Sequence, residues 1–267
     1  TMKALHMEEA YKERRGSIEP TAVFEFVSLD RDYNGSIFSC LRSARENARA
    51  VRGSLTSELW ETLNSTWLDA RAQVASRSSH IDIGQFVEWV KERSHLTRGV
   101  TIGTMMRDEA FHFTRIGTFL ERGDSTARIL TVYQDDLVPG ADAGVVPDPY
   151  EWSVLLRALS AFEVYRRVYR DVITPARVAQ LLILHDDMPR SLLRCCKEVY
   201  NNLKSVANEQ SDETERRAGE MHAMLHFARM EEILLIGLPQ FLKHFLAKLH
   251  DLGERIASDF LVPPAEA

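Results

Sequence analysis

Residues 107–130, RDEAFHFTRIGTFLERGDSTARIL, decide the fold class of this chain. At 100° per residue, this segment aligns Phe113, Ile116, Leu120, Ala127 and Leu130 on one stripe, as an amphipathic helix requires. Apolar residues recur at the same spacing through most of the chain, and strand-like alternation is nearly absent. We therefore predict an all-α protein, built as a helical bundle.

Glycines and prolines separate the helical segments and set their predicted ends. Thr174-Pro175 and Asp148-Pro149 each place a capping oxygen before a proline, whose missing N–H is harmless in a first helical turn. We expect a break at Gly99 and a loop over residues 138–149. The pattern predicts helices over residues 2–15, 20–28, 35–52, 56–76, 81–95, 107–137, 150–170, 174–184, 189–206, 212–236 and 239–259.

The chain also repeats itself, which indicates an internal duplication. The residues from Ala4 to Tyr11 share identities with those 154 positions later, and the residues from Ile18 to Val51 with those 155 positions later. The longer match consists of Ile18, Pro20, Val23, Leu29, Asp32, Ser36, Cys40, Asn47 and Val51 against Ile173, Pro175, Val178, Leu184, Asp187, Ser191, Cys195, Asn202 and Val206. Coincidence between amphipathic helices would not match polar positions such as these serines and aspartates.

The repeat predicts two halves, residues 1–106 and 107–267, packed together as one globular domain. In the second half the long helix from residue 107 precedes the matched region. Subtracting 154 from 107 gives −47, so the equivalent helix of the first half would precede the sequence. We therefore expect the first half to lack its leading helix.

Composition and charge argue against several classes of function. Lys and Arg number 33 against 39 Asp and Glu, a net charge of −6, which argues against a surface built for nucleic acid. The longest apolar stretch, residues 233–239, is far short of the roughly 20 residues that span a bilayer. The three cysteines are too few for a disulfide framework and fit a reducing compartment. We expect a cytoplasmic protein that binds neither membranes nor nucleic acid.

Charged residues gather on the flanks of the helix over residues 107–130. Arg115 and Arg122 share one flank, and Glu121 and Arg128 share the next. These charges could be ion pairs between helices or a solvated face. Alternatively, the arginines bind a carboxylate or phosphate bidentately while Glu121 and Asp124 orient them. Gly123, on the apolar stripe, is expected to permit the close approach of another helix.

Three motifs together resemble the alpha-E family, a duplicated all-helical bacterial family. They are Asp108-Glu-x-Phe-x-Phe-x-Arg-x-Gly-x-x-Leu-Glu-Arg-x-Asp-x-Thr-Ala-Arg128, Ala44-Arg-Glu-Asn-Ala-Arg-x-Val-Arg52 and Met188-Pro-Arg-Ser191. Family members usually open with a helix that carries a Glu-Arg-Ala-Glu pattern, which is absent here. They tend to be encoded beside, or fused to, ATP-grasp peptide-ligase-like and transglutaminase-like proteins. The resemblance thus implies these two partners and a role in peptide synthesis or modification.

A second basic stripe is formed by Arg42, Arg45, Arg49 and Arg52, spaced three, four and three residues apart. Such a stripe usually is a solvated face or pairs with acids. Otherwise it docks an acidic partner or a phosphate-bearing ligand. We include Arg45, Arg49 and Arg52 among the candidate ligand-binding residues.

Cofactor and metal signals are weak. The sequence has no phosphate loop of the Walker type, no dinucleotide-binding glycine pattern and no Gly-x-Ser-x-Gly elbow, so no cofactor is expected. Glu109 and His112 have the Glu-x-x-His spacing of di-iron bundles, but a satisfied polar role is the simpler interpretation. Cys195 and Cys196 lie within an amphipathic segment and are expected to be packing residues.

These observations favour an accessory or substrate-presenting component of an ATP-grasp-associated system. In this hypothesis, the Arg- and Glu-rich helices bind a partner protein or a carboxylate- or phosphate-bearing ligand. Two alternatives stay open: an enzyme that acts on a small peptide or amino-acid conjugate, and a metal-binding helical bundle.

Overall fold

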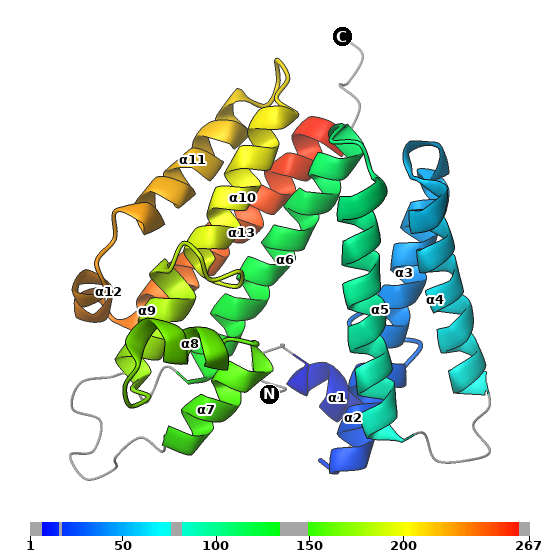
Figure 1. Ribbon diagram of the computed structural model, residues 1–267, viewed down its shortest axis with the longest axis horizontal. Coiled ribbons are helices and arrows are strands. Elements are labelled where there is room, and N and C mark those ends of the chain that lie inside the picture. Colours follow the sequence, from blue (N-terminus) through cyan, green and yellow to red (C-terminus); the bar gives the residue numbers. More distant parts are fainter. Residues whose placement is uncertain (1–6, 16–17, 76–81, 134–148, 262–267) are drawn as a thin grey trace. The chain divides into compact units, whose positions relative to one another are not determined.

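Helices form the regular structure of this protein, shown as a computed structural model in Figure 1. The structure describes residues 7–15, 18–75, 82–133 and 149–261, and these ranges contain helices and no strand. The all-α prediction is therefore confirmed. In the same ranges, every helix is too short or too polar to span a membrane.

The chain divides into two compact units between Phe111 and His112. We call them the N-terminal unit and the C-terminal unit. The sequence repeat placed the division between residues 106 and 107, before the long helix rather than in its first turn. The expected packing of the two halves into one globular domain stays a prediction.

The N-terminal unit contains five α-helices and one 3-10 turn in its described residues. They are α1 (Glu8–Arg15), α2 (Pro20–Leu29), α3 (Ile37–Ala50), η1 (Arg52–Ser54), α4 (Ser57–Ala75) and α5 (Ile83–Thr104). Helix α3 packs against α2 and α4, and α4 packs against α5. Leu29, Phe38, Ala70, Val74 and Phe86 form the small core between them, with Trp67 and Trp89 packed at its edge.

The C-terminal unit has a larger core and more helices. They are α6 (Glu109–Val132), α7 (Pro149–Ala158), α8 (Phe162–Tyr169), α9 (Pro175–Leu184), α10 (Leu192–Ser205), α11 (Asp212–His226), α12 (Met230–Ile236) and α13 (Leu238–Leu261). Helices α10 and α11 pack along each other, and α13 packs against α11 and α12 (Figure 1). Trp152, Leu156, Leu181 and Phe245 are fully buried between these helices.

Equivalent helices of the two units begin at the same positions of the repeat. The bounds of α2 and α3 recur in α9 and α10 after 155 residues, and those of α1 recur in α8 after 154 residues. Helices α4 and α5 begin 155 residues before α11 and α13. The duplication predicted from the sequence is therefore confirmed as two multi-helix units.

Four predicted features were wrong. Thr174 lies at the N-cap of α9 as expected, but its side chain makes no capping hydrogen bond. The helix over 150–170 is two helices, because Ser160 adopts a left-handed conformation (φ 54°) and Ala161 N–H bonds Leu156 C=O at 2.7 Å, which ends α7 in a Schellman-type cap. The helix over 212–236 stops at His226 and resumes at Met230, which buries Met230 in the core. Helix α5 continues through Gly99, since a single glycine weakens a helix by only about 1 kcal/mol. Residues 2–6 of the first predicted helix and 138–148 of the predicted loop lie outside the described residues.

The duplicated serines Ser36 and Ser191 hold the start of α3 and α10 in the same way. Each hydroxyl is fully buried and accepts a bond from a backbone N–H three residues later, at 3.1 Å and 3.0 Å. Each also donates to the carbonyl six residues before it, Asp30 at 2.5 Å and His185 at 2.6 Å. A polar match in the repeat is thus explained by a shared cap that also fixes the preceding loop.

We expect Ser36→Ala and Ser191→Ala each to lower the free energy of unfolding by roughly 1–2 kcal/mol, since a cap is lost and a partly buried carbonyl loses the serine donor. Denaturant titration of each variant measures the change. Ser43→Ala, in the exposed middle of α3, is the matched control and should change little. Losses no larger than that of the control would contradict the shared role.

Candidate functional site

Arg115, in the second turn of α6, is held in an ion pair within the C-terminal unit. Its guanidinium lies 2.8 Å from Glu198 of α10 and over the Phe119 ring at 4.5 Å. The other oxygen of Glu198 pairs with Arg194 at 2.7 Å. Only 21% of the Arg115 side chain and 16% of the Glu198 side chain are exposed, so this pair links α6 to α10 in a largely dry setting. This placement favours the structural interpretation of Arg115.

Glu121 and Arg122 are adjacent in the motif, but their side chains have different partners. Arg122 donates to the Pro189 carbonyl at 3.2 Å and lies over the Phe119 ring at 4.9 Å. It thereby joins the long motif of α6 to the Met188-Pro-Arg-Ser191 motif before α10. Glu121 is exposed and accepts a bond from Ser125 at 3.3 Å. Arg122 therefore links α6 to the turn before α10 through a carbonyl, not through Glu121.

Asp124 and Arg128 pair with each other and with His250 of α13. Arg128 donates to one oxygen of Asp124 at 2.6 Å, and His250 lies 2.7 Å from the other. Burial alone would raise the pKa of the Asp124 carboxyl, but the hydrogen bonds from Arg128 and His250 outweigh it and lower the pKa. Asp124 thus stays ionised and neutralises Arg128, where the sequence left open that it orients a ligand-binding arginine.

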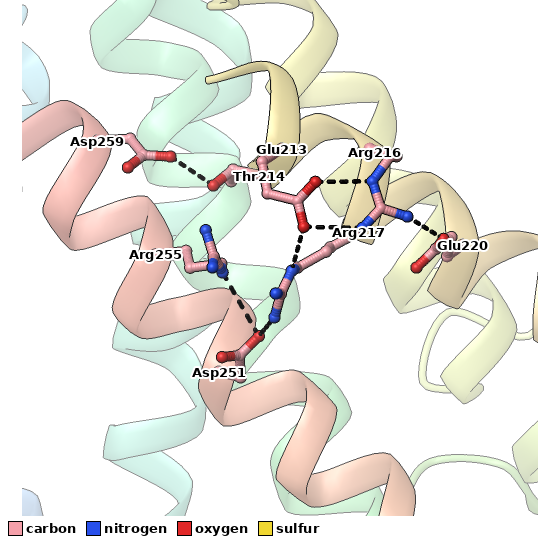
Figure 2. A network of polar contacts seen from close by, with 8 residues as sticks. All are labelled: Glu213, Thr214, Arg216, Arg217, Glu220, Asp251, Arg255 and Asp259. Carbon is pink, nitrogen blue, oxygen red and sulfur yellow. Dashed lines mark hydrogen bonds and ion pairs between the residues drawn. The ribbon is translucent and has the colours of Figure 1, made fainter. Parts of the chain in front are cut away.

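A further charged network joins α11 to α13 (Figure 2). Glu213 accepts bonds from Arg216 at 2.7 Å and Arg217 at 2.8 Å, and Arg217 also pairs with Asp251. The hydrogen bonds from Arg216 and Arg217 lower the pKa of the Glu213 carboxyl to about 2. Figure 2 shows these side chains directed toward one another across the two helices, with Thr214 bonded to Asp259 at 2.5 Å. Acids and bases are mixed here, which suits helix packing rather than anion binding.

The weak metal candidates do not lie in a ligand cluster. His112 bonds Asn202 at 2.8 Å through Nδ1, and Asn202 donates in turn to the Glu198 carbonyl. Glu109 is exposed at the start of α6. Among the described residues, no group of three or more His, Cys, Asp or Glu side chains could hold a metal ion. The placement of His112 agrees with its simpler interpretation as a satisfied polar group.

The adjacent cysteines of α10 lie in the core of the C-terminal unit. Cys195 and Cys196 are 1% and 4% exposed. Burial raises the pKa of the Cys195 thiol to about 12 and also raises the pKa of Cys196. Both thiols are therefore protonated at neutral pH and pack as small apolar side chains, as the sequence indicated.

The basic stripe of α3 in the N-terminal unit is divided between two roles. Arg45 and Arg52 both lie 5.7 Å from the Trp60 ring of α4, and Arg45 also bonds Asn64 at 3.2 Å. Arg52 donates to the Leu55 carbonyl at 3.1 Å, which holds the turn between α3 and α4. Arg49 is the outward member, with 68% of its side chain exposed and Glu46 at 3.8 Å.

The first arginine of that stripe, Arg42, lines a pocket of about 570 Å³ between α3 and α4. Arg31 and Arg71 line the same pocket, together with Phe38, Trp67, Leu68, Ala72 and Ala75. The Phe38 and Trp67 rings are 4.9 Å apart, and the Arg31 guanidinium lies 5.6 Å from the centre of Phe38. Across the described part of the chain, no acidic side chain pairs with Arg31, Arg42 or Arg71. Three like charges therefore gather around an aromatic wall without an internal counter-charge.

This pocket brings together residues that are far apart in the sequence and carry no motif. Arg31 lies in the loop before α3, and Arg71 in the last two turns of α4. Arg42 stands out in the sequence only as the first member of the stripe. The pocket is the described site with the clearest binding chemistry, because the guanidinium fork suits carboxylate and phosphate groups.

Comparison with known proteins gives the family of this chain. The sequence profile of the Alpha-E family, described as a predicted alpha-helical domain with a conserved ER motif, matches residues 1–261. Similar curated proteins include uncharacterised proteins of Mycobacterium bovis and of Mycobacterium tuberculosis. Each is 24% identical over 252 residues, a match that covers 88% of this chain and 27% of the relative.

The chain thus spans about a quarter of the length of the curated relatives that it matches. No solved structure is significantly similar to it. The sequence holds five Glu-Arg pairs, of which Glu121-Arg122 lies in the motif of α6. The profile match over nearly the whole chain, together with the duplicated helical units, leads to one conclusion: the chain belongs to the Alpha-E family.

Proposed function

We propose that this chain is an accessory or substrate-presenting component of an ATP-grasp peptide-ligase system in the cytoplasm. In this role it binds a carboxylate- or phosphate-bearing ligand, or an acidic partner surface, through arginines of its helices. The ATP-grasp peptide-ligase-like protein and the transglutaminase-like protein implied by the family resemblance are its proposed partners.

The pocket lined by Arg31, Arg42 and Arg71 is the observation that carries this proposal. Arg115 and Arg128 of α6 pair with Glu198 and Asp124, and Arg122 donates to the Pro189 carbonyl, so these arginines are already engaged within the C-terminal unit. The pocket arginines are exposed and lack acidic partners in the described residues. A surface with uncompensated guanidinium groups favours an anionic ligand or partner.

The core thiols and the ion-paired α6 cluster support an accessory rather than a catalytic role. Protonated, buried thiols are poor nucleophiles. Arg115 and Arg128 of this cluster are held in ion pairs with Glu198 and Asp124, and a guanidinium group is neither a nucleophile nor a general base.

Co-expression with the ATP-grasp peptide-ligase-like protein, the proposed partner, tests the proposal. We expect the ligase to co-purify with the tagged chain and its peptide-ligating turnover to rise when the chain is added. The double variant Arg42→Gln/Arg71→Gln should weaken both effects, whereas Arg98→Gln, an exposed arginine of α5, should not. Absence of a complex together with unchanged ligase turnover would sink the proposal, as would turnover of a peptide by the isolated chain.

A further inference from the structure

The arginine pocket has an exact counterpart in the C-terminal unit, and the two differ in charge. Because α3 and α4 match α10 and α11 at an offset of 155, Arg31, Arg42, Trp67 and Arg71 correspond to Asp186, Lys197, His222 and His226. The burial pattern supports this register, since Leu59, Thr66 and Ala70 are buried, as are their counterparts Thr214, Met221 and Leu225. The duplication therefore allows two equivalent sites with different charged residues to be compared within one chain.

In the C-terminal unit this site supplies its own anion. The Asp186 carboxylate lies 2.5 Å from the Lys197 ammonium, the counterpart of Arg42. The hydrogen bond from Lys197 lowers the pKa of the Asp186 carboxyl, which is therefore ionised at neutral pH. Burial lowers the pKa of His222, so this ring is mostly neutral at physiological pH. The pair of Asp186 and Lys197 is thus balanced without a ligand.

In the N-terminal unit a third cation stands where the C-terminal unit has a carboxylate. Arg31 occupies the position of Asp186, so Arg42 lacks the acid that pairs with its counterpart Lys197. Cations gathered in one pocket repel one another, and an external anion would relieve this repulsion. The pocket also offers more than charge, because Trp67 and Phe38 form an aromatic wall and Leu68, Ala72 and Ala75 form an apolar one.

The apolar wall follows from the spacing of its residues on α4. Leu68, Arg71, Ala72 and Ala75 lie at positions i, i+3, i+4 and i+7, which share one face of a helix. Leu68 is 49% exposed, and the two alanines are exposed beside it. This face therefore presents one cation within a patch of small apolar side chains, which suits a ligand with an anionic head and an apolar body.

We infer that this pocket binds a small molecule or peptide end in which a carboxylate or phosphate group is attached to an apolar moiety. The anionic group supplies to Arg42 the counter-charge that Asp186 supplies to Lys197 in the C-terminal unit, and it also contacts Arg31. The apolar moiety lies along Trp67 and the apolar face of α4. This inference rests on the proposed function, since it names the ligand class of the arginine surface.

Calorimetric titration of the full chain with three probes tests the inference. N-acetylphenylalanine carries a carboxylate on an apolar body, phenyl phosphate carries a phosphate, and N-acetylphenylalanine amide lacks the charge. We expect saturable binding of at least one anion and none of the amide. The tighter of the two anions identifies the head group. Equal binding of the amide, or binding of neither anion, would overturn the inference.

The variant Arg31→Asp restores in the N-terminal unit the arrangement of the C-terminal unit. The introduced carboxylate should pair with Arg42, weaken anion binding by roughly tenfold or more, and leave the thermal midpoint unchanged or raised. Arg98→Asp makes the same charge change on α5 and should leave binding unchanged. Anion binding that survives Arg31→Asp at wild-type strength would contradict the assigned pocket. If Arg31→Asp does not fold, Arg42→Gln provides the same comparison.

Failure of this inference and failure of the proposed function are distinguishable. If the chain binds the anionic probes at this pocket but forms no complex with the ligase, the pocket assignment stands and the proposed function fails. A chain that engages the ligase but binds neither anion overturns the pocket assignment alone.

Discussion

Glu198→Ala is expected to lower the free energy of unfolding by about 2–3 kcal/mol. The carboxylate of Glu198 pairs with both Arg115 and Arg194, and its removal leaves the mostly buried Arg115 guanidinium without an acid. Breaking a fully buried pair costs roughly 3–5 kcal/mol, and the residual exposure of this pair reduces the cost. Urea titration followed by circular dichroism measures the change.

An exposed ion pair of the same unit provides the control for Glu198. Arg216 and Glu220 pair on the surface of α11 with 55% of each side chain exposed, so Glu220→Ala should change stability little. A loss at Glu198 no larger than that at Glu220 would mean that Arg115 does not depend on its acid. Such a result would return Arg115 to the ligand-binding candidates.

Gly123→Leu is expected to destabilise the C-terminal unit by about 2–3 kcal/mol, because it overpacks the seam between three helices. A Cβ at Gly123 would lie 3.5 Å from Cys195 Cβ of α10 and 3.6 Å from Leu249 of α13, and the Phe245 ring is 4.0 Å away. A methyl group fits at these distances, but the longer leucine side chain has no room beyond it. Thermal unfolding of the purified variant is the measurement.

Gly123→Ala separates tight packing from helix propensity. The alanine methyl group makes ordinary contacts here, and alanine favours a helix interior by about 1 kcal/mol over glycine. We therefore expect this variant to be as stable as the wild type or slightly more stable. Equal stability of the leucine and alanine variants would show that the seam is looser than its distances indicate.

Much of the fold followed from local sequence. Helical periodicity located the helices, and the offsets of 154 and 155 identified the two units before any contact was known. The close approach expected at Gly123 is confirmed by its neighbours on α10 and α13. The breaks at Ser160 and after His226 escaped prediction, because the burial of Ala161 and Met230 outweighs local helix preference.

Less of the candidate site could be predicted from the sequence. Periodicity placed Arg115, Arg122 and Arg128 on a helix but gave no information about Glu198, Pro189 and His250, which come from other segments. Arg31 and Arg71 are separated by 40 residues, and no spacing rule connects a loop residue to the end of a later helix. Their meeting depends on the packing of α3 against α4.

The sequence by itself determined the helical class and the duplication, because helical periodicity and identities at a fixed offset can be read along the chain. Only the tertiary structure decided which arginines are neutralised and which are not. The reason is that an ion pair depends on the distance between side chains of different helices, and this distance is set by core packing. In the C-terminal unit, Lys197 pairs with Asp186. At the equivalent place in the N-terminal unit, Arg31 and Arg42 line one pocket.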